Sequence, residues 1–253
     1  MSPRPLALVT GAARRIGRAI ALELARHGWD VAVHHRASLD DAAATVAELR
    51  ALGAEAHAVA ADLAETAQCE ALFGRVQQAF AGRTPQAVVN NASRFDYDDV
   101  AGFDPQTLHA ALAANTAPAV ILARALHAAG GGCVVNLLDQ KLANPNPDYF
   151  SYTLSKAALD AATTMLAMAL APSTRVCAVS PGVTLLSGEM SAAEFAASHR
   201  MTPLGRSSSA EDVAAAVRFL LESPAITGTT LLVDGGQHLL GQPRDVMFLA
   251  RQA

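Results

Sequence analysis

The amino-acid sequence predicts an α/β fold: a single domain, residues 1–253, with a doubly wound parallel β-sheet of about seven strands and helices on both faces. Strand-like and helix-like runs alternate almost to the end of the chain, and parallel strands require crossover connections of this kind. A glycine-containing turn separates the first strand from the first helix. The length of 253 residues suits one large α/β sheet, although length alone would allow two domains.

Each element follows from a local pattern. Apolar and β-branched runs predict strands at residues 6–10, 31–35, 57–61, 87–90, 133–138, 176–180 and 230–233. Helical spacing predicts helices at residues 17–27, 38–52, 66–81, 105–129, 152–171 and 210–221, the fourth of them bent near Pro118. Gly28 and Gly53 follow the first two helices as C-terminal glycines, and Ser38 is the expected N-cap of the second.

Two segments interrupt the alternation. Residues 93–104 and 184–205 are polar or irregular, and both follow strands. Ligands of open α/β sheets bind beyond the carboxyl ends of the strands, so both segments are candidate substrate loops. Asp98 and Asp99 of the first loop are expected to be solvated. The C-terminal extension, residues 241–253, carries an apolar cluster that we expect to pack on a neighbouring subunit.

The composition argues against several classes of partner. The net charge is −4 and the charges are mixed along the chain, which disfavours nucleic acid or an anionic membrane. No apolar run approaches transmembrane length, and the N-terminal run is too short for a signal peptide. Cys69, Cys133 and Cys177 are dispersed and odd in number, which favours reduced core thiols over disulfides or a metal site. We therefore expect a cytoplasmic protein.

One constellation of residues carries acid–base chemistry. Tyr152 and Lys156 are four residues apart in a helical run and so share one helical face. An ammonium beside a phenol favours the phenolate, so we expect Lys156 to lower the pKa of Tyr152 and make it a general acid or base. Asp139 follows the strand 133–138 and is expected to reach the same point.

The turn TGAARRIG, residues 10–17, has the position of a phosphate-binding turn between a strand and a helix. Gly11 and Gly17 would let backbone N–H groups approach a pyrophosphate at the helix N-terminus. The next strand ends in HHR, residues 34–36, without the acid that binds the ribose of NAD. Arg36, Ser38 and one of Arg14 or Arg15 can instead bind a 2′-phosphate. This pattern predicts NADP(H) over NAD(H); the alternative is that Arg36 is a solvated surface charge.

Several further motifs follow in a fixed order: AADL at 60–63, NNAS at 90–93, Asn115, YTLSK at 152–156, SPG at 180–182 and VDGG at 233–236. In this order, the chain resembles the short-chain dehydrogenase/reductase family over nearly its whole length. The resemblance implies a Rossmann-type fold, commonly a homotetramer, with Tyr152 as catalytic acid, Lys156 on the nicotinamide ribose and Asn115 holding a water of a proton relay. With the residues named above, the expected cofactor contacts are Gly11, Arg14, Arg15, Ile16, Gly17, His34, Arg36, Ser38, Asp62, Leu63, Asn91, Ala92, Ser93, Tyr152, Lys156, Pro181, Gly182 and Thr184. For Thr184, a helix N-cap is the alternative role.

Three departures from the family pattern are informative. Arg15 replaces the middle glycine, Asp139 replaces the serine thirteen residues before Tyr152, and Arg94 and Phe95 follow NNAS. Together they resemble the pteridine reductase branch, including the bacterial dihydromonapterin reductases. That resemblance implies that Arg15, Phe95, Asp139 and Tyr152 bind the substrate, that Phe95 stacks on the pterin, and that Asp139 assists proton delivery.

The chemistry of these side chains is consistent with such a substrate. Reduction of a pterin C=N bond leaves a ring nitrogen that needs a proton, which a carboxyl group near a tyrosine can relay. Phe95 offers a flat apolar face and Arg15 planar donors. Alternatives remain: Phe95 as a core residue of its loop, Asp139 as a structural acid, an NADPH-dependent carbonyl or imine reductase on the same fold, or a cofactor-binding regulatory protein that has lost catalysis.

Overall fold

The computed structural model describes residues 3–186 and 190–251. It contains one parallel sheet with the strand order β3-β2-β1-β4-β5-β6-β7. The strands are β1 (Leu6–Val9), β2 (Asp30–His35), β3 (Ala56–Ala60), β4 (Ala87–Asn90), β5 (Gly132–Leu137), β6 (Thr174–Pro181) and β7 (Thr230–Val233). The order reverses between β1 and β4, which is the switch point where α/β sheets of this kind bind ligands. The doubly wound parallel sheet predicted from the sequence is confirmed.

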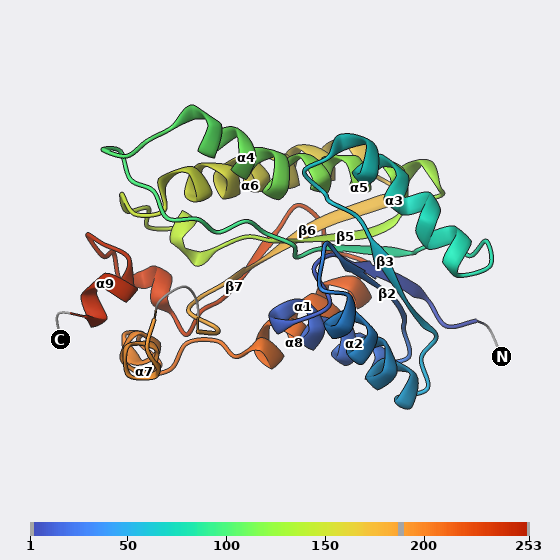
Figure 1. Ribbon diagram of the computed structural model, residues 1–253, viewed down its shortest axis with the longest axis horizontal. Coiled ribbons are helices and arrows are strands. Elements are labelled where there is room, and N and C mark those ends of the chain that lie inside the picture. The colour runs from blue at the N-terminus through green and yellow to red at the C-terminus, as the bar shows by residue number, and fades with distance from the viewer. Residues whose placement is uncertain (1–2, 187–189, 252–253) are drawn as a thin grey trace.

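The helices cover both faces of the sheet (Figure 1). Those on one face are α1 (Arg15–Arg26), α2 (Leu39–Ala51) and α8 (Ala210–Glu222), and those on the other are α3 (Thr66–Ala79), α4 (Pro105–Asn115), α5 (Ala117–Ala128) and α6 (Phe150–Leu170). The first layer packs through Ile20, Leu24 and Val217 on strand residues such as Val9 and Val33. The second layer packs through Phe73, Leu122 and Leu126. Because both faces are covered, β1, β2 and β4 are buried along their whole length.

The helix expected at residues 105–129 is two helices, which is a correction. α4 ends at Asn115, α5 begins at Ala117, and Thr116 lies between them with φ −112° and ψ −54°. Pro118 has no N–H to donate to the carbonyl of the preceding turn, and its ring disfavours helical backbone just before it. The predicted bend is therefore a break.

Two segments for which no helix was predicted contain helices at the carboxyl ends of the strands. α7 (Ala192–Arg200) lies in the predicted loop 184–205 and begins with a capping box of Ser191 and Glu194. α9 (Val246–Ala250) lies in the predicted extension 241–253 and packs against α7. Residues 187–189 of the loop and 252–253 of the extension lie outside the described residues. Short 3₁₀ turns occupy Gln140–Leu142 and Gln237–Leu239.

Two smaller expectations need correction, and a third is met in position only. Val246 and Met247 of the extension are buried within their own chain, so these two side chains are covered without a neighbouring subunit. Asp98 is buried, and its carboxylate accepts hydrogen bonds from the N–H (2.9 Å) and hydroxyl (2.5 Å) of Ser151. Ser38 precedes α2 as expected, but its side chain makes no capping hydrogen bond with the described residues.

Candidate active site

Two adjoining cavities lie at the carboxyl ends of the strands. The first is lined by residues that follow β4, β5 and β6 and by the C-terminal segment, among them Phe95, Asp139, Tyr152, Lys156, Pro181, Gly182, Thr184 and Met247. The second is lined by the turn between β1 and α1 and by the end of β2, including Gly11, Arg14, Gly17, His34, Arg36, Ser38, Ala92 and Ser93. Arg15, Ile16, Asn91 and Ser93 line both cavities, so one continuous site can hold an extended ligand.

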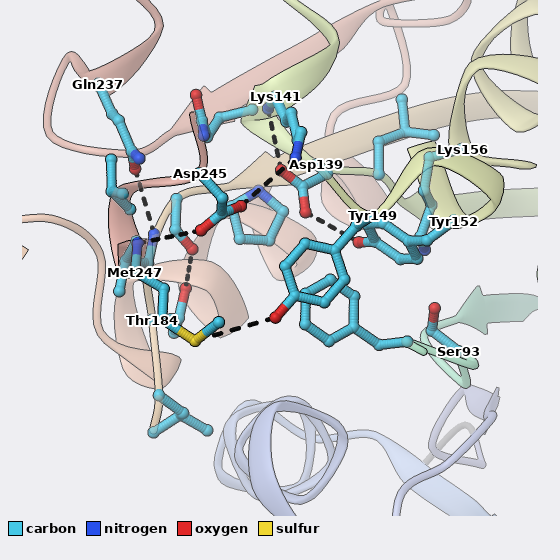
Figure 2. Close-up of a pocket in the computed structure, with 18 of the residues that line it drawn as sticks. Ser93, Asp139, Lys141, Tyr149, Tyr152, Lys156, Thr184, Gln237, Asp245 and Met247 are labelled. Atoms are coloured by element: carbon cyan, nitrogen blue, oxygen red, sulfur yellow. Dashed lines mark hydrogen bonds and ion pairs between the residues drawn. The ribbon is translucent and has the colours of Figure 1, made fainter. Parts of the chain in front are cut away.

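Tyr152 and Asp139 form a direct pair in the first cavity (Figure 2). The Tyr152 hydroxyl donates to Oδ2 of Asp139 at 2.8 Å, and the backbone N–H of Lys141 donates to Oδ1 at 2.9 Å. Burial raises the pKa of Asp139 above its usual range, against the opposing effect of these two hydrogen bonds. The aspartate predicted from the sequence therefore lies where it can pass a proton to the tyrosine.

The expected lowering of the Tyr152 pKa is wrong. Burial, followed by the negative charge of Asp139, raises the pKa of Tyr152 well above its ordinary value. Lys156 cannot offset this, because its Nζ donates to the carbonyl of Leu137 at 2.6 Å and lies 5.7 Å from the centre of the tyrosine ring. Burial also lowers the pKa of Lys156 to about 8. Tyr152 is thus a protonated donor at neutral pH.

Asn115 ends α4 beneath the loop that follows β4. Its amide oxygen accepts from the N–H of Arg94 at 2.7 Å, and its amide nitrogen donates to the Arg94 carbonyl at 3.0 Å and to Ser155 at 2.9 Å. Ser155 belongs to α6, the helix that carries Tyr152. Asn115 therefore connects the loop 93–95 to the helix that carries Tyr152.

The turn between β1 and α1 shows why small residues are needed there. Gly11 has φ +63°, and a Cβ on it would lie 3.1 Å from Cα of Ala92. A Cβ on Gly17 would clash with the carbonyl oxygen of Gly11. Arg15 has φ +56°, in the left-handed region that favours glycine. The side chain that replaces the family's glycine is therefore held in a strained backbone at the junction of both cavities.

His34 supports this turn from the end of β2. Its Nδ1 accepts from the N–H of Gly11 at 3.0 Å, and its Nε2 bonds to the carbonyl of Ala61 at 3.0 Å. Burial lowers the pKa of His34 to about 4, so the ring is neutral at physiological pH. Both ring nitrogens are engaged by the backbone, so His34 positions the turn and its imidazole nitrogens are not free for a cofactor.

The charge of the second cavity agrees with the predicted 2′-phosphate site. Arg14, Arg36 and Ser38 line it, and its described lining includes no Asp or Glu. Arg14 also lies 3.5 Å from Asp41 in an exposed ion pair. Among the described residues, the linings of the two cavities omit Asp62 and Leu63, which were predicted as cofactor contacts. Leu63 lies in the hydrophobic core, and the carboxylate of Asp62 accepts from the N–H of Ala64.

An aromatic wall closes the first cavity beside Tyr152. Phe95 stacks on Tyr149 with ring centres 4.2 Å apart and meets Tyr152 edge-on at 4.6 Å. Phe95 remains 41% exposed, which is more than a core residue of its loop would be. Tyr149 has φ +53° and its hydroxyl donates to Sδ of Met247 at 3.8 Å. The position of Phe95 leaves its ring available to a flat ligand.

Thr184, at the exit of β6, makes contacts within the protein. Its hydroxyl donates to the carbonyl of Gly182 at 2.9 Å and lies 2.7 Å from the hydroxyl of Ser208. The alternative of a helix N-cap is wrong, since α7 is capped by Ser191. A side chain on Gly182 would clash with Ser207, which explains the glycine of the SPG motif.

Several charged residues of the first cavity were not predicted as site residues. Lys141, Arg244 and Asp245 line it, together with Tyr149 and Met247. The sequence marks Lys141 only as a cation near Asp139, and nothing in the local pattern connects it with residues about a hundred positions later. These contacts depend on tertiary packing.

A glycine-containing turn between the first strand and helix, next to a Tyr–Asp–Lys group, is the arrangement expected of a nicotinamide-dependent oxidoreductase. A family model described as enoyl-(acyl carrier protein) reductase matches residues 11–238. The chain is 31% identical over 247 residues to the 3-oxoacyl-(acyl-carrier-protein) reductase FabG of Staphylococcus aureus, covering 92% of this chain and 98% of the relative. It belongs to the short-chain dehydrogenase/reductase family and is an NAD(P)H-dependent oxidoreductase.

Solved structures show two kinds of relative. FolM alternative dihydrofolate reductase 1 from Brucella canis, complexed with NADP, has a TM-score of 0.88 and 38% identity, covering 97% of this chain and 98% of that one. The angucycline C-6 ketoreductase LanV with bound NADP has a TM-score of 0.87 and 28% identity, covering 93% and 96%. Both agree with the predicted preference for NADP(H). Among the described residues, no helix combines the length and apolar character needed to cross a bilayer.

Proposed function

We propose that the protein is an NADPH-dependent reductase of a pteridine, of the dihydropterin, dihydromonapterin or dihydrofolate type. The observation that carries the proposal is the 2.8 Å hydrogen bond from the Tyr152 hydroxyl to the half-buried Asp139 carboxylate. A ring nitrogen that must be protonated after hydride addition needs an acid with a supply of protons behind it. Asp139 occupies the position where the usual family member has a serine, which can polarise a carbonyl but is a poor acid.

The residues around this pair fit a flat, nitrogen-rich ring. Phe95 presents a half-exposed aromatic face, and Arg15 brings planar donors to the same cavity. The similarity to the Brucella canis FolM structure supports the same substrate class. The acid-free second cavity, with Arg14, Arg36 and Ser38, supports NADP(H) as the cofactor.

The proposed mechanism assigns one task to each residue. Bound NADPH supplies the hydride. Tyr152 donates its proton to the substrate nitrogen, and Asp139 returns a proton to the tyrosine through their hydrogen bond. Lys156 lies beneath Tyr152, with its Nζ 5.7 Å from the centre of the tyrosine ring, where it would hold the ribose of the bound cofactor. Phe95 and Arg15 orient the ring so that little motion is needed in the reaction.

The second candidate is an NADPH-dependent carbonyl reductase. It is favoured by relatives such as FabG of Staphylococcus aureus and LanV, whose names specify keto substrates. The two candidates differ in what they require of Asp139. A ketone oxygen can take its proton from Tyr152 with a serine beside it, whereas the proposed pteridine reaction depends on the carboxyl group.

The test is NADPH oxidation, followed by absorbance, with dihydropterin and dihydrofolate beside a panel of simple ketones. We expect turnover of the dihydropterin by the wild type and its collapse in Asp139→Ser. Glu70→Gln, an exposed acid on α3, is the matched control and should leave turnover unchanged. Turnover of ketones alone, or a harmless Asp139→Ser substitution, would overturn the pteridine assignment.

We also propose that the protein acts as a homotetramer in the cytoplasm. The outer face of α6 exposes Leu154 (40%), Met165 (67%) and Met168 (78%), an apolar surface suited to another subunit. Gel filtration with light scattering should give four chains per particle, and a Met165→Lys/Met168→Lys variant should lower that number. A monomer in the wild type would refute this part of the proposal.

A further inference from the structure

The C-terminal segment Arg244–Met247 forms one wall of the first cavity. Figure 2 shows Asp245 and Met247 on the side of the cavity opposite Tyr152, with Lys141 between Asp245 and Asp139. Met247 is buried against Tyr149 and Tyr152. The wall is therefore made by residues about a hundred positions from the catalytic helix.

Buried charges hold this segment in place. The carboxylate of Asp148 is buried and accepts from Nε of Arg244 at 2.8 Å and from the N–H of Asp245 at 2.7 Å. Lys141 is 5% exposed, and its Nζ donates to the carbonyl of Asp148 at 2.6 Å and lies 3.4 Å from Oδ2 of Asp245. An unpaired buried ammonium is costly, so Lys141 requires a carboxylate at this position.

Lys141 also contacts the proton source directly. Its backbone N–H donates to Oδ1 of Asp139 at 2.9 Å, while Oδ2 of Asp139 accepts from Tyr152. Lys141 therefore connects the Asp245 carboxylate, which contacts its side chain, to Asp139, which contacts its backbone N–H. Its negative charge is also among the causes, after burial, that raise the pKa of Asp139.

We propose that Asp245 is a positioning residue of the active site: paired with Lys141, it fixes the turn whose backbone N–H orients Asp139 and holds the segment 244–247 over the cavity. This inference rests on the proposed role of Asp139 as proton source. It assigns a task in the reaction to the C-terminal segment, through a carboxylate that does not touch the substrate's reacting atoms.

The predicted consequence is a change in the pH profile. Among the described residues, the charged or titratable side chains that line the cavity around Asp139 are Tyr152 and Lys156 on α6, Lys141 and Tyr149 on the segment after β5, Arg15 at the start of α1, and Arg244 and Asp245 near α9. Asp148 is paired with Arg244 behind this lining. Replacement of Asp245 by Asn removes a like charge and leaves Lys141 without its counterion. Both effects favour the ionised form of Asp139, so its pKa falls. Since the protonated form donates, the alkaline limb of the kcat profile should move to lower pH by about half to one unit.

The experiment compares Asp245→Asn, Asp245→Glu and the control Glu70→Gln across pH 5–10 with dihydropterin and saturating NADPH. We expect the shift in Asp245→Asn, recovery of most of it in Asp245→Glu, and none in Glu70→Gln. A folded Asp245→Asn enzyme with a lower kcat but an unmoved limb would overturn the proposal, because a merely structural wall would produce that result.

A substrate-independent measurement separates this inference from the proposed function. Hydrogen–deuterium exchange of the free full-length protein should rise at least several-fold in residues 246–250 of Asp245→Asn, and stay at the wild-type level in Asp245→Glu. Unchanged exchange in Asp245→Asn would overturn the positioning role. If the wild type reduces only ketones, the pteridine assignment fails, and the same pH comparison on the ketone still decides whether Asp245 acts on the proton source.

Discussion

Replacement of Asp139 by Asn removes the proposed proton source while it keeps the size and shape of the side chain. The side chain keeps its size, so its amide oxygen can still accept from the backbone N–H of Lys141. That N–H lies 2.9 Å from Oδ1 of Asp139 in the wild type. The amide nitrogen then faces the Tyr152 hydroxyl, which is 2.8 Å from Oδ2 in the wild type. The variant therefore retains a hydrogen bond to Tyr152 but has no proton to deliver.

The expected magnitude follows from this loss. A positioned general acid contributes roughly 10²–10⁴-fold to a rate, so kcat for the dihydropterin should fall by about that factor. KM should change little, because the cavity keeps its shape. The tyrosine loses a neighbouring negative charge that raises its pKa, so any residual activity should fall off at lower pH than in the wild type.

The same Asp139→Asn substitution that lowers kcat should raise the free energy of unfolding at alkaline pH. Burial raises the pKa of Asp139 in the folded state above its unfolded value, so the folded state binds more protons. The free energy of unfolding of the wild type therefore falls as the pH rises through that window, by about 1.4 kcal/mol for each unit of difference. Asn does not titrate, so the variant should be more stable than the wild type at pH 8 and similar to it near pH 4.

Two assays check this pair of predictions. Steady-state NADPH oxidation gives kcat and KM, and urea unfolding at pH 4 and pH 8 gives the free energies of unfolding. The reasoning would be refuted by an Asp139→Asn enzyme that keeps more than a tenth of wild-type kcat, or by one that is less stable than the wild type at pH 8. Glu70→Gln controls for the removal of a charge far from the cavity.

Three further predictions concern the cofactor side of the site. Arg15→Gly removes a non-glycine residue from a left-handed backbone conformation that costs about 1–2 kcal/mol, whereas the added glycine costs about 0.5–1 kcal/mol in chain entropy. The Tm should therefore stay level or rise, while KM for the dihydropterin rises. A clear fall in Tm would contradict the strain argument. Arg36→Ala should raise KM for NADPH by about 10–100-fold and leave KM for NADH nearly unchanged, as one lost charge-assisted hydrogen bond requires; equal losses for both cofactors would argue that Arg36 is only a surface charge. His34 has a folded pKa of about 4, below its unfolded value, so the free energy of unfolding should fall by about 3 kcal/mol in total as the pH falls from about 6.5 to 4. His34→Gln should flatten this part of the urea-unfolding profile. An unaltered profile would show that another group causes the acid sensitivity.

The sheet could be predicted because its signals are local. Buried parallel strands are short apolar runs, and the observed strands differ from the expected ranges by at most two residues at either end. The helix at 105–129 was harder, because the Ala-rich pattern continues across Thr116 and only Pro118 marks the break. α7 and α9 are short and weakly periodic, so helix formation there depends on packing against each other more than on propensity.

In the candidate site, too, the features set by local sequence could be predicted and those set by tertiary contacts could not. Tyr152 and Lys156 could be placed together because a helix brings i and i+4 to one face. The direction of the Tyr152 pKa could not be predicted, because it depends on the ammonium turning to the Leu137 carbonyl and on the carboxylate contacting the phenol instead. The pair of Lys141 and Asp245 is separated by 104 positions, and no local pattern specifies such a contact.

Backbone strain gives an independent indication of which side chains matter. Arg15 and Tyr149 both have positive φ, +56° and +53°, and both line the first cavity. A glycine at either position would relieve about 1–2 kcal/mol of strain, yet the chain keeps a guanidinium at one and a phenol at the other. Exposed Ala81 also has a positive φ, +51°, so the strain alone does not identify a functional residue. Arg15 and Tyr149 differ from it because strain and a place in the cavity lining coincide. For Arg15 the sequence already indicated this, by departing from a family glycine. For Tyr149 the evidence is structural: its ring stacks on Phe95 and its hydroxyl contacts Met247, so it joins the substrate loop to the C-terminal wall.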